Sequence, residues 1–311
     1  MIVCCGEALI DMLPRRLPTG EEVYLPVAGG AVFNTAITLG RLGAKAGFFS
    51  GISSDMLGEV LQDSLRESNV DFSLSHISGR PTTLAFVKLV NGNAQYQFYD
   101  EASAGRMITP EDLPHLPDEV EALHFGAISL IPEPCGATYE TLALSEAPRR
   151  VISLDPNIRP GFITDAEAHR ARIHRMIAVA DIVKVSDEDL HWLEPEIRSD
   201  EDGENVIRSW LSGGTSVVLM TKGSEGAHLF TANGDIRVPA RKVEVVDTVG
   251  AGDSFNGGFL HGLSKAGLLD KQKLASAGPE SLQAAAELAV RVAAVTVSRA
   301  GANPPWEHEL S

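Results

Sequence analysis

The sequence predicts an α/β fold: a doubly wound, mostly parallel sheet with helices on both faces, plus a small β-sheet lid. Short apolar runs rich in β-branched residues alternate with segments whose apolar residues recur at helical spacing. Such alternation is typical of a parallel sheet covered by helices. Two stretches with antiparallel patterns interrupt it. We therefore expect one domain over residues 1–311, with lid strands inserted at about 12–29 and 81–105.

The predicted elements follow one another along the chain. The apolar runs expected to form buried strands are residues 1–6, 46–51, 121–130, 151–157, 181–186 and 216–223. The segments with helical spacing are residues 31–43, 55–68, 168–180, 203–214 and 253–263. Since ligands of open α/β sheets bind outside the carboxyl ends of the strands, the residues directly after each run are the first candidates for a site.

The interrupting stretches are residues 21–30 and 80–103. The second contains a hairpin signal, Asn-Gly-Asn at 91–93, between strands of alternating character. A small sheet here is a lid, a dimerisation surface or a simple extension of the main sheet. The aromatic side chains of Tyr96 and Phe98 either grip a ligand or pack a sheet face or subunit interface.

Composition narrows the classes of partner. The 311 residues include 26 Lys and Arg against 42 Asp and Glu, a net charge of −16. This excess of acid argues against nucleic acid or an anionic membrane as partner. The 3 cysteines show neither zinc spacing nor a disulfide framework. No signal-peptide pattern and no apolar run of roughly 18 residues is present, so we expect a cytoplasmic protein.

The segment "EVVDTVGAGDSFNGGFL" at 244–260 places a carboxylate where a strand turns into a helix. Gly250, Ala251 and Gly252 allow a tight turn that presents backbone N–H groups at the positive end of the helix dipole. Asp253 then either caps the helix or acts in catalysis. A G-x-G-x-x-G dinucleotide fingerprint fails because residue 255 is Phe, and no Walker A loop occurs.

The segment "AGGAVFN" at 28–34 opens a helix with two glycines, Gly29 and Gly30, which permit a ligand to approach the backbone closely. Asn34 can both donate to and accept from hydroxyl groups. Together with the carboxylate of Asp11, this composition is usual for a sugar site.

The two segments, in this order and about 200 residues apart, resemble the paired signatures of the ribokinase-like (PfkB) family of sugar kinases. The resemblance spans essentially the whole chain. It implies an ATP-dependent, Mg²⁺-requiring kinase with a doubly wound core and a β lid. Asp253 matches the catalytic base and Gly250, Ala251 and Gly252 match the anion hole. Asp11, Gly30 and Asn34 match sugar-binding positions.

The resemblance also implies a nucleotide site and a cation site. "TKGSEG" is similar to a turn near ATP and gives Thr221, Gly223 and Gly226, while Gly252 faces the phosphates. Asp247, Val249 and Gly301 resemble the monovalent-cation site, for potassium, of some members.

One departure concerns the Asn-x-x-Glu that many members carry near the metal and phosphates. Here Ser186 and Asp189 replace it, and the shorter Asp189 would reach Mg²⁺ through water. "KVSDED", which begins at Lys184, and "DPNIRP", which contains Arg159, are typical of fructokinase-like members. Arg106 in "EASAGRM" belongs to a third stretch of that pattern. Arg159 is either a ligand of substrate or phosphate or a surface charge.

The predicted activity is phosphorylation of a primary hydroxyl of a monosaccharide, fructose before the alternatives 2-keto-3-deoxygluconate and ribose. Two alternatives come from other classes: a nicotinamide-dependent oxidoreductase and a catalytically silent sugar-binding protein. The missing glycine fingerprint disfavours the first and the presence of Asp253 the second. We further expect the helix dipole to keep Asp253 ionised at neutral pH, and the lid strands to join two subunits in a homodimer.

Overall fold

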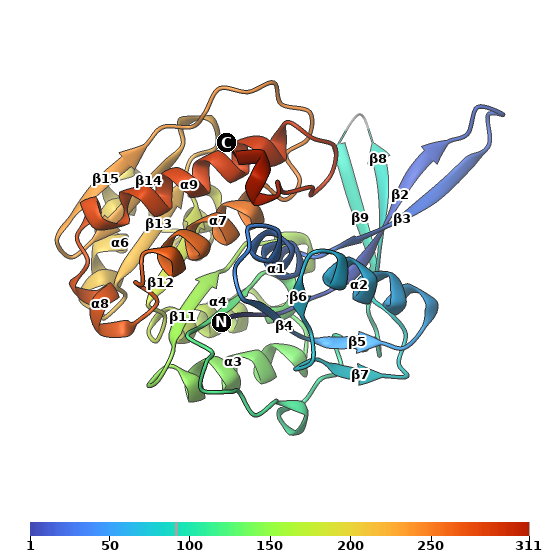
Figure 1. The fold of residues 1–311 in the computed structure, drawn as a ribbon, viewed down its shortest axis with the longest axis horizontal. Helices are drawn as coiled ribbons and strands as arrows, with labels where there is room; N and C mark the ends of the chain where they lie inside the picture. The colour runs from blue at the N-terminus through green and yellow to red at the C-terminus, as the bar shows by residue number, and fades with distance from the viewer. Residues whose placement is uncertain (91–92, 311) are drawn as a thin grey trace.

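The computed structural model describes residues 1–90 and 93–310, and the side chains of residues 88–96 lie outside this description. The chain forms a central sheet with helices packed on both faces, and a smaller sheet projects from one end (Figure 1). The main sheet has the strand order β15-β14-β13-β12-β11-β10-β1-β4-β6. Its strands are parallel except for β14 and β15, which are antiparallel to their neighbours. The predicted fold class is confirmed.

The strands of the main sheet are β1 (Ile2–Cys5), β4 (Ala46–Phe49), β6 (Val70–Asp71), β10 (Ala122–Gly126), β11 (Val151–Asp155), β12 (Ile182–Ser186), β13 (Val217–Thr221), β14 (Ala227–Thr231) and β15 (Gly234–Val238). The lid sheet contains β2 (Leu9–Arg16), β3 (Glu22–Gly29), β8 (Leu84–Val90) and β9 (Asn93–Tyr99), and a third pair is β5 (Gly51–Ser53) with β7 (His76–Ser78).

The α-helices are α1 (Ala31–Arg41), α2 (Met56–Glu67), α3 (Cys135–Glu146), α4 (Ala166–Ile177), α5 (Asp187–Leu193), α6 (Asp200–Ser212), α7 (Ala251–Lys265), α8 (Lys271–Ser276) and α9 (Pro279–Val297). Short 3-10 turns are η1 (Pro110–Asp112), η2 (Ala127–Leu130), η3 (Pro160–Phe162), η4 (Gly223–Glu225) and η5 (Glu307–Leu310). Within the described residues, no helix is long and apolar enough to cross a membrane.

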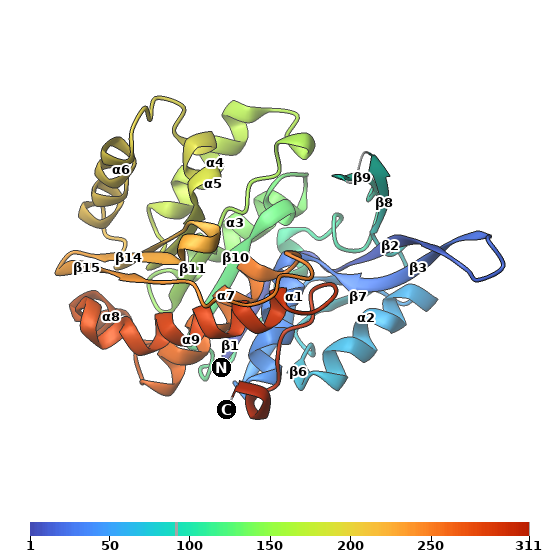
Figure 2. The ribbon, with the colours of Figure 1, turned by 90° about the horizontal axis from the view of Figure 1, so that it is seen from above.

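The sheet is buried on both faces because its strands are apolar at successive positions. Ile2 and Cys4 point into the core formed with α1, α7 and α9, whereas Val3 and Cys5 point into the core formed with α3, α4 and α6. Figure 2 shows these two helix layers on opposite sides of the sheet. The continuous apolar runs in the sequence reflect this burial on both faces.

The helices differ in whether a side chain caps their first turn. The helices α2, α4, α5, α6 and α8 begin at Ser or Asp caps whose side chains accept backbone N–H groups. By contrast, α1 and α7 begin at Gly30 and Gly250, which have no side chain to cap them. The Ser199 cap also explains why α6 begins at Asp200, three residues before the predicted start.

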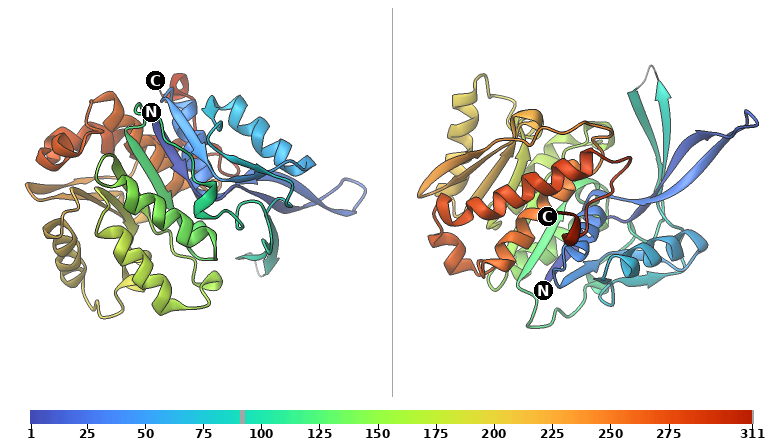
Figure 3. Two further views of the ribbon diagram at one scale, coloured as in Figure 1. Left: turned by 90° about the horizontal axis from the view of Figure 1, so that it is seen from below. Right: turned by 45° about the horizontal axis from the view of Figure 1, so that its top comes forward.

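The lid sheet has the order β3-β2-β8-β9 and projects from the main sheet, with α2 beside β2 and β3 (Figure 3). Three of its strands, β3, β8 and β9, come from the two stretches that interrupt the alternation, whereas β2 begins at Leu9, before the first of them. The predicted hairpin signal at 91–93 falls partly on residues 91–92, which lie outside the described residues. The register Val87 opposite Tyr96 and Leu84 opposite Tyr99 joins β8 to β9 as an antiparallel pair.

Candidate active site

The carboxyl ends of the parallel strands and the lid enclose a cleft of about 740 Å³. Most of the predicted site residues line it, although they come from segments spread over the chain. Those that line it are Asp11, Gly30, Asn34, Phe98, Arg159, Lys184, Ser186, Asp189, Thr221, Gly223, Val249, Gly250, Ala251, Gly252 and Asp253. The fold therefore brings together, at the carboxyl ends of the strands, site residues that lie far apart in the sequence.

The start of α7 forms the floor of the cleft. Gly250 has a left-handed φ of 76°, and a Cβ on it would lie 2.7 Å from Ala302 Cβ, so both backbone and space require glycine. The N–H groups of the first turn have no partner in the helical ladder, as at any helix N-terminus. The predicted turn can thus present Gly252 and its neighbours to an anion.

Asp253 lies in the first turn of α7 but makes no capping hydrogen bond. Its Oδ2 instead accepts a hydrogen bond of 2.9 Å from Asn34 Nδ2, and its backbone carbonyl accepts one of 3.2 Å from Thr35 Oγ1. The side chain is buried, with 7% exposed. The capping interpretation is therefore wrong, and α1 holds the carboxyl group of Asp253 toward the cleft.

Burial raises the pKa of Asp253 to about 7, despite the Asn34 hydrogen bond and the nearby Lys184, which act in the opposite direction. Burial thus favours the protonated carboxyl group at this position. This burial acts against the expectation that the helix dipole keeps Asp253 ionised at neutral pH, which stays a prediction.

Asp11 lies on β2, where burial raises its pKa to about 6. A Cβ on Gly29 would overlap Asp11 Oδ2, so the neighbouring strand β3 needs glycine there to leave room for the carboxylate. Gly30 has a φ of 113°, and a Cβ on it would lie 2.8 Å from the Glu7 carbonyl oxygen. The two glycines therefore shape the wall beside Asp11 and Asn34.

Gly29→Ala should displace the Asp11 carboxylate and raise KM for the sugar at least about tenfold, because small displacements of positioning groups are costly. Gly79→Ala is the matched control, since a Cβ there meets nothing within 4 Å. Steady-state kinetics of both variants check this. An unchanged KM in Gly29→Ala would show that Asp11 does not position the sugar.

Glu7 is a buried cleft residue to which sequence reasoning gave no role. Its Oε1 accepts hydrogen bonds from the backbone N–H of Ala31 at 2.8 Å and of Val32 at 3.4 Å, and its Oε2 accepts one from Ser129 N at 3.3 Å. Glu7 thus replaces the missing cap of α1, one turn before Asn34. Its place directly after the first strand was the available signal.

Lys184 is buried below the α7 turn, and its Nζ lies 3.1 Å from Asp155 Oδ2. Burial disfavours the ammonium, but the carboxylates of Asp155, Asp189 and Asp253 outweigh burial and raise the Lys184 pKa. Asn256 Nδ2 donates to the same Asp155 oxygen at 2.7 Å. The Lys184 Nζ would lie 3.1 Å from a Cβ on Gly252, so this positive charge sits directly behind the anion-hole turn.

Ser186 and Asp189 form a capping box at the start of α5, with hydrogen bonds of 3.0 Å in both directions. The other oxygen of Asp189, Oδ1, accepts a 2.8 Å hydrogen bond from Ile158 N. Both carboxylate oxygens of Asp189 therefore already accept hydrogen bonds from backbone N–H groups. This arrangement suits contact with a metal through water better than direct ligation. The exposed carboxylates of Asp187 and Glu188 line the cleft beside them.

A second cavity, of about 790 Å³, adjoins the cleft at the α7 turn. It shares Thr221, Gly223 and Gly252 with the cleft, and Gly226 lines it as well. Apolar residues of α7, α9 and the preceding loop form much of its wall, among them Phe255, Val290, Ala294 and Val297. Such a surface suits the flat, largely apolar base of a nucleotide.

The predicted cation-site residues meet beside the cleft: Val249 lines it, whereas Asp247 and Gly301 do not. Asp247 Oδ1 accepts a 3.0 Å hydrogen bond from Val249 N, and Asp247 Oδ2 accepts one of 2.9 Å from Gly301 N. In the part of the chain that the structure describes, no group of three or more His, Cys, Asp or Glu side chains is arranged to hold a metal ion. A monovalent cation here would depend on backbone carbonyl groups.

The remaining predicted substrate residues do not all line the same cavity. Phe98 and Arg159 line the cleft, and Arg159 Nη1 donates to the Ile158 carbonyl at 3.0 Å. Arg106 lines a different, neighbouring cavity, where it forms a 3.0 Å ion pair with Asp100. The side chain of Tyr96 lies outside the described residues.

Fold and site together define a carbohydrate kinase of the doubly wound α/β class. The chain matches the pfkB family of carbohydrate kinases over residues 1–309, and it belongs to that family. The resemblance inferred from its two signatures is confirmed, as is the prediction of an enzyme.

Named relatives agree with this assignment. The chain is 58% identical over 283 residues to a fructokinase of Rhizobium leguminosarum bv. trifolii, which covers 91% of this chain and 86% of that protein. Its fold is similar to a fructokinase of Xylella fastidiosa with bound ATP, with a TM-score of 0.87, 29% identity and coverage of 99% and 97% of the two chains. A fructokinase of Vibrio cholerae bound to fructose, ADP and calcium superimposes with a TM-score of 0.82, 26% identity and coverage of 97% and 94%.

Proposed function

We propose that this carbohydrate kinase transfers the γ-phosphoryl group of ATP to a primary hydroxyl of fructose. The observation that carries the proposal is the pairing of Asp253 with Asn34 at an uncapped helix N-terminus, inside a cleft lined by Asp11. The identity of 58% to a named fructokinase supports fructose over ribose and 2-keto-3-deoxygluconate. The oxidoreductase and silent-binder alternatives find no support in the family.

In this proposal the sugar binds beside Asp11, Asn34 and Gly30, with its primary hydroxyl directed at Asp253. Asn34 holds one oxygen of Asp253 and so orients the carboxyl group. The ionised Asp253 accepts the hydroxyl proton as the phosphoryl group transfers. Since the transition state is loose and the alcohol becomes acidic late, a weak base with a pKa near 7 is sufficient.

The γ-phosphoryl group lies at the N–H groups of Gly250, Ala251 and Gly252, with the positive end of the α7 dipole behind it. Lys184 adds a full positive charge behind the same turn. The remainder of the nucleotide extends past Thr221 and Gly223 into the apolar cavity beside Gly226, and Ser186 lies at the phosphate end.

The donors at the start of α5 fit Mg²⁺, which prefers oxygen ligands and retains several waters. Asp187 and Glu188 are exposed to the cleft, and Asp189 would act through water. If bound there, Mg²⁺ would neutralise negative charge on the phosphate groups of the nucleotide. Asp247, Val249 and Gly301 would hold a potassium ion that supports the α7 turn. The three buried, unpaired cysteines suit the reducing cytoplasm.

A coupled assay of ATP consumption with a panel of sugars tests the proposed function. We expect turnover only with both a sugar and Mg²⁺, and a higher kcat/KM for fructose than for ribose or 2-keto-3-deoxygluconate. A higher kcat/KM for either competitor would refute fructose as the substrate. Equal ATP turnover without any sugar would refute the kinase assignment for this site.

The lid sheet is proposed to join two subunits. Tyr24 of β3, Phe86 of β8 and Tyr99 of β9 form a row of edge-to-face rings, with centroids 5.1 and 5.5 Å apart. Tyr24 and Tyr99 are 50% and 51% exposed, which is unusual for a packed aromatic row on a monomer surface.

We expect sedimentation to show a dimer at micromolar concentration, and Tyr24→Lys to convert it to a monomer. Val23→Lys, on the opposite face of the same strand, is the matched control and should remain dimeric. A wild-type monomer at that concentration would contradict the proposed interface.

A further inference from the structure

A cavity of about 510 Å³ lies directly beyond the acceptor end of the cleft. Phe98 of the lid and Phe162 of η3 line both spaces, with ring centroids 4.3 Å apart in an edge-to-face contact. Glu7 and Ile128 also line both. The two spaces are thus neighbouring compartments that share these four lining residues.

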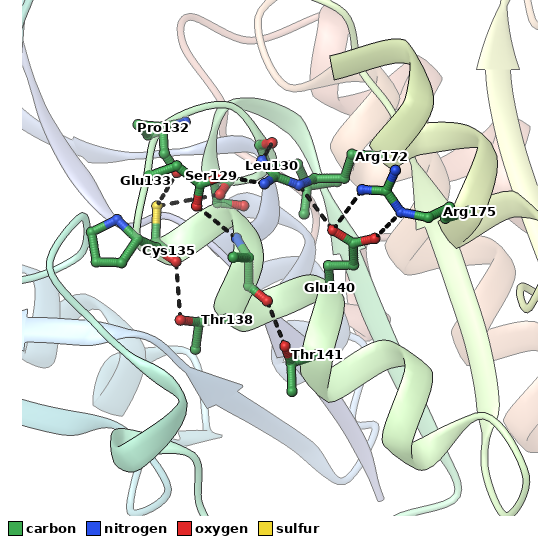
Figure 4. Close-up of polar contacts among 12 residues, drawn as sticks. Ser129, Leu130, Pro132, Glu133, Cys135, Thr138, Glu140, Thr141, Arg172 and Arg175 are labelled. Carbon is green, nitrogen blue, oxygen red and sulfur yellow. Dashed lines mark hydrogen bonds and ion pairs between the residues drawn. The ribbon is translucent and has the colours of Figure 1, made fainter. Parts of the chain in front are cut away.

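The far wall of this outer cavity is held rigidly between α3 and α4 (Figure 4). Arg172 donates to Glu140 Oε2 at 3.2 Å, to the Leu130 carbonyl at 2.8 Å and to the carboxylate of Glu133. A Cβ on Gly136 would overlap the Arg172 guanidinium, so the guanidinium packs directly against this glycine. The cavity is therefore a preformed space within the usual size range of ligand sites.

His169 of α4 lines the cavity with only 5% of its surface exposed. Neither ring nitrogen has a hydrogen-bond partner within residues 1–90 and 93–310. The Leu130 carbonyl, which also accepts the hydrogen bond from Arg172, lies near the ring and acts to raise the His169 pKa. Both ring nitrogens are almost fully covered, so a ligand in the cavity can pair with the imidazole only after the ring rotates toward it.

The charges around the cavity select a neutral partner. Four carboxylates line its described part, and Asp100 and Glu133 pair with Arg106 and Arg172. No arginine charge is therefore left over for an anionic ligand. Burial, with Arg172 second, lowers the His169 pKa to about 4, so the imidazole is neutral and offers one donor and one acceptor. A hydroxyl group, which both donates and accepts, complements it.

The apolar walls agree with a sugar ring. Ile128, Ile131, Pro132 and the rings of Phe98 and Phe162 offer flat apolar contacts to its C–H face. We propose that this cavity is an outer compartment of the acceptor site, which binds the neutral, hydroxylated second ring of an acceptor larger than a hexose. This inference rests on the proposed function, because the first ring would occupy the cleft as fructose does.

The test uses sucrose, a fructose unit with a second neutral ring, and methyl β-fructofuranoside, which lacks the second ring. Ala168→Trp should obstruct the outer cavity, since Ala168 lines it but not the cleft. Ala178→Trp makes the same change at the other, exposed end of α4 and is the matched control. His169→Phe removes the polar atoms while largely keeping the volume.

We expect the wild-type enzyme to phosphorylate both glycosides. Ala168→Trp should lower kcat/KM for sucrose at least about tenfold while changing that for fructose and the methyl glycoside less than about twofold. His169→Phe should lower kcat/KM for sucrose about five- to tenfold, as loss of buried hydrogen bonds does. Ala178→Trp should change none of these values.

Two outcomes overturn the inference while leaving the proposed function intact: fructose turnover without any sucrose turnover, or an equal loss for fructose and sucrose in Ala168→Trp. Absence of fructose turnover would instead refute the proposed function itself. Melting temperatures of all three variants, measured in the same buffer, show whether a loss reflects unfolding.

Discussion

Asp253→Asn should lower kcat at least about a hundredfold, because a positioned general base contributes 10²–10⁴-fold. Sugar binding should remain near normal, since the amide oxygen of Asn can still accept the hydrogen bond from Asn34. The expected change therefore lies in kcat and not in KM. Steady-state kinetics with fructose and Mg·ATP measure both.

The same variant should be more stable than the wild type at alkaline pH. The pKa of Asp253 is raised from 3.8 to about 7 in the folded protein, so the folded state binds more protons than the unfolded chain between these values. The stability associated with this group is present below about pH 4 and is lost as pH rises through 7. We expect Asp253→Asn to gain on the order of 2–4 kcal/mol at pH 8 and nothing at pH 4.

Thermal melting of the wild type and of Asp253→Asn between pH 4 and pH 8 measures this difference in stability. Asp165→Asn, at an exposed helix cap, is the control. Retention of most of the wild-type kcat by Asp253→Asn would show that a different group accepts the proton. A large loss of stability at pH 8 would show that the ionised carboxylate is structural.

Lys184→Met should have the second largest effect, because it removes one partner of a buried ion pair. Lys184 and Asp155 are 6% and 2% exposed, and their charged atoms lie 3.1 Å apart. Leaving Asp155 unpaired should destabilise the fold by about 3–5 kcal/mol. Loss of the charge behind Gly252 should also lower kcat at least about tenfold, since it removes charge stabilisation at the transferring group.

The double variant Lys184→Met/Asp155→Asn separates the two roles. Neutralising both partners should restore most of the stability, as replacement of whole buried ion pairs does. The activity should stay low, because the positive charge behind the anion hole is still missing. Denaturant unfolding and kinetics on the same samples measure these two effects. Recovery of activity together with stability would mean that Lys184 acts only on the fold.

Much of the fold was predictable because burial on both faces of the sheet leaves a local pattern. The run at 2–5 has no polar residue, and its two neighbours β4 and β10 contain only one, His124. The helix α9 was missed, since its alanine-rich sequence is apolar over most of its circumference and shows little periodicity. The antiparallel strands β14 and β15 were also missed: both are only five residues long, and the edge strand β15 is half-exposed and mixed in character.

The site was predictable where a local backbone requirement produced it. Glycine at 250 is required by a left-handed φ and a close contact, and both belong to a turn that the sequence marks. The contacts of Asn34 with Asp253 and of Lys184 with Asp155 link residues 219 and 29 positions apart. Only the folded topology brings such pairs together, so sequence patterns could suggest the partners without pairing them.

The protonation state of Asp253 depended on burial that no local pattern reveals. Helix dipole and desolvation act on the same carboxyl group in opposite directions, and the sequence shows only the first. The position of Arg106 likewise depends on a contact that the sequence does not show. Its pairing with Asp100 places it in the outer cavity and not beside the transferred hydroxyl.

The pH dependence of kcat/KM for fructose tests the central claim, that Asp253 must lose a proton to accept one from the sugar. We predict an acid limb with an apparent pKa of about 7, below which kcat/KM falls about tenfold per pH unit, and no such limb in the residual activity of Asp253→Asn. A wild-type profile that stays flat from pH 5 to pH 9, or an acid limb that persists unchanged in Asp253→Asn, would contradict the account.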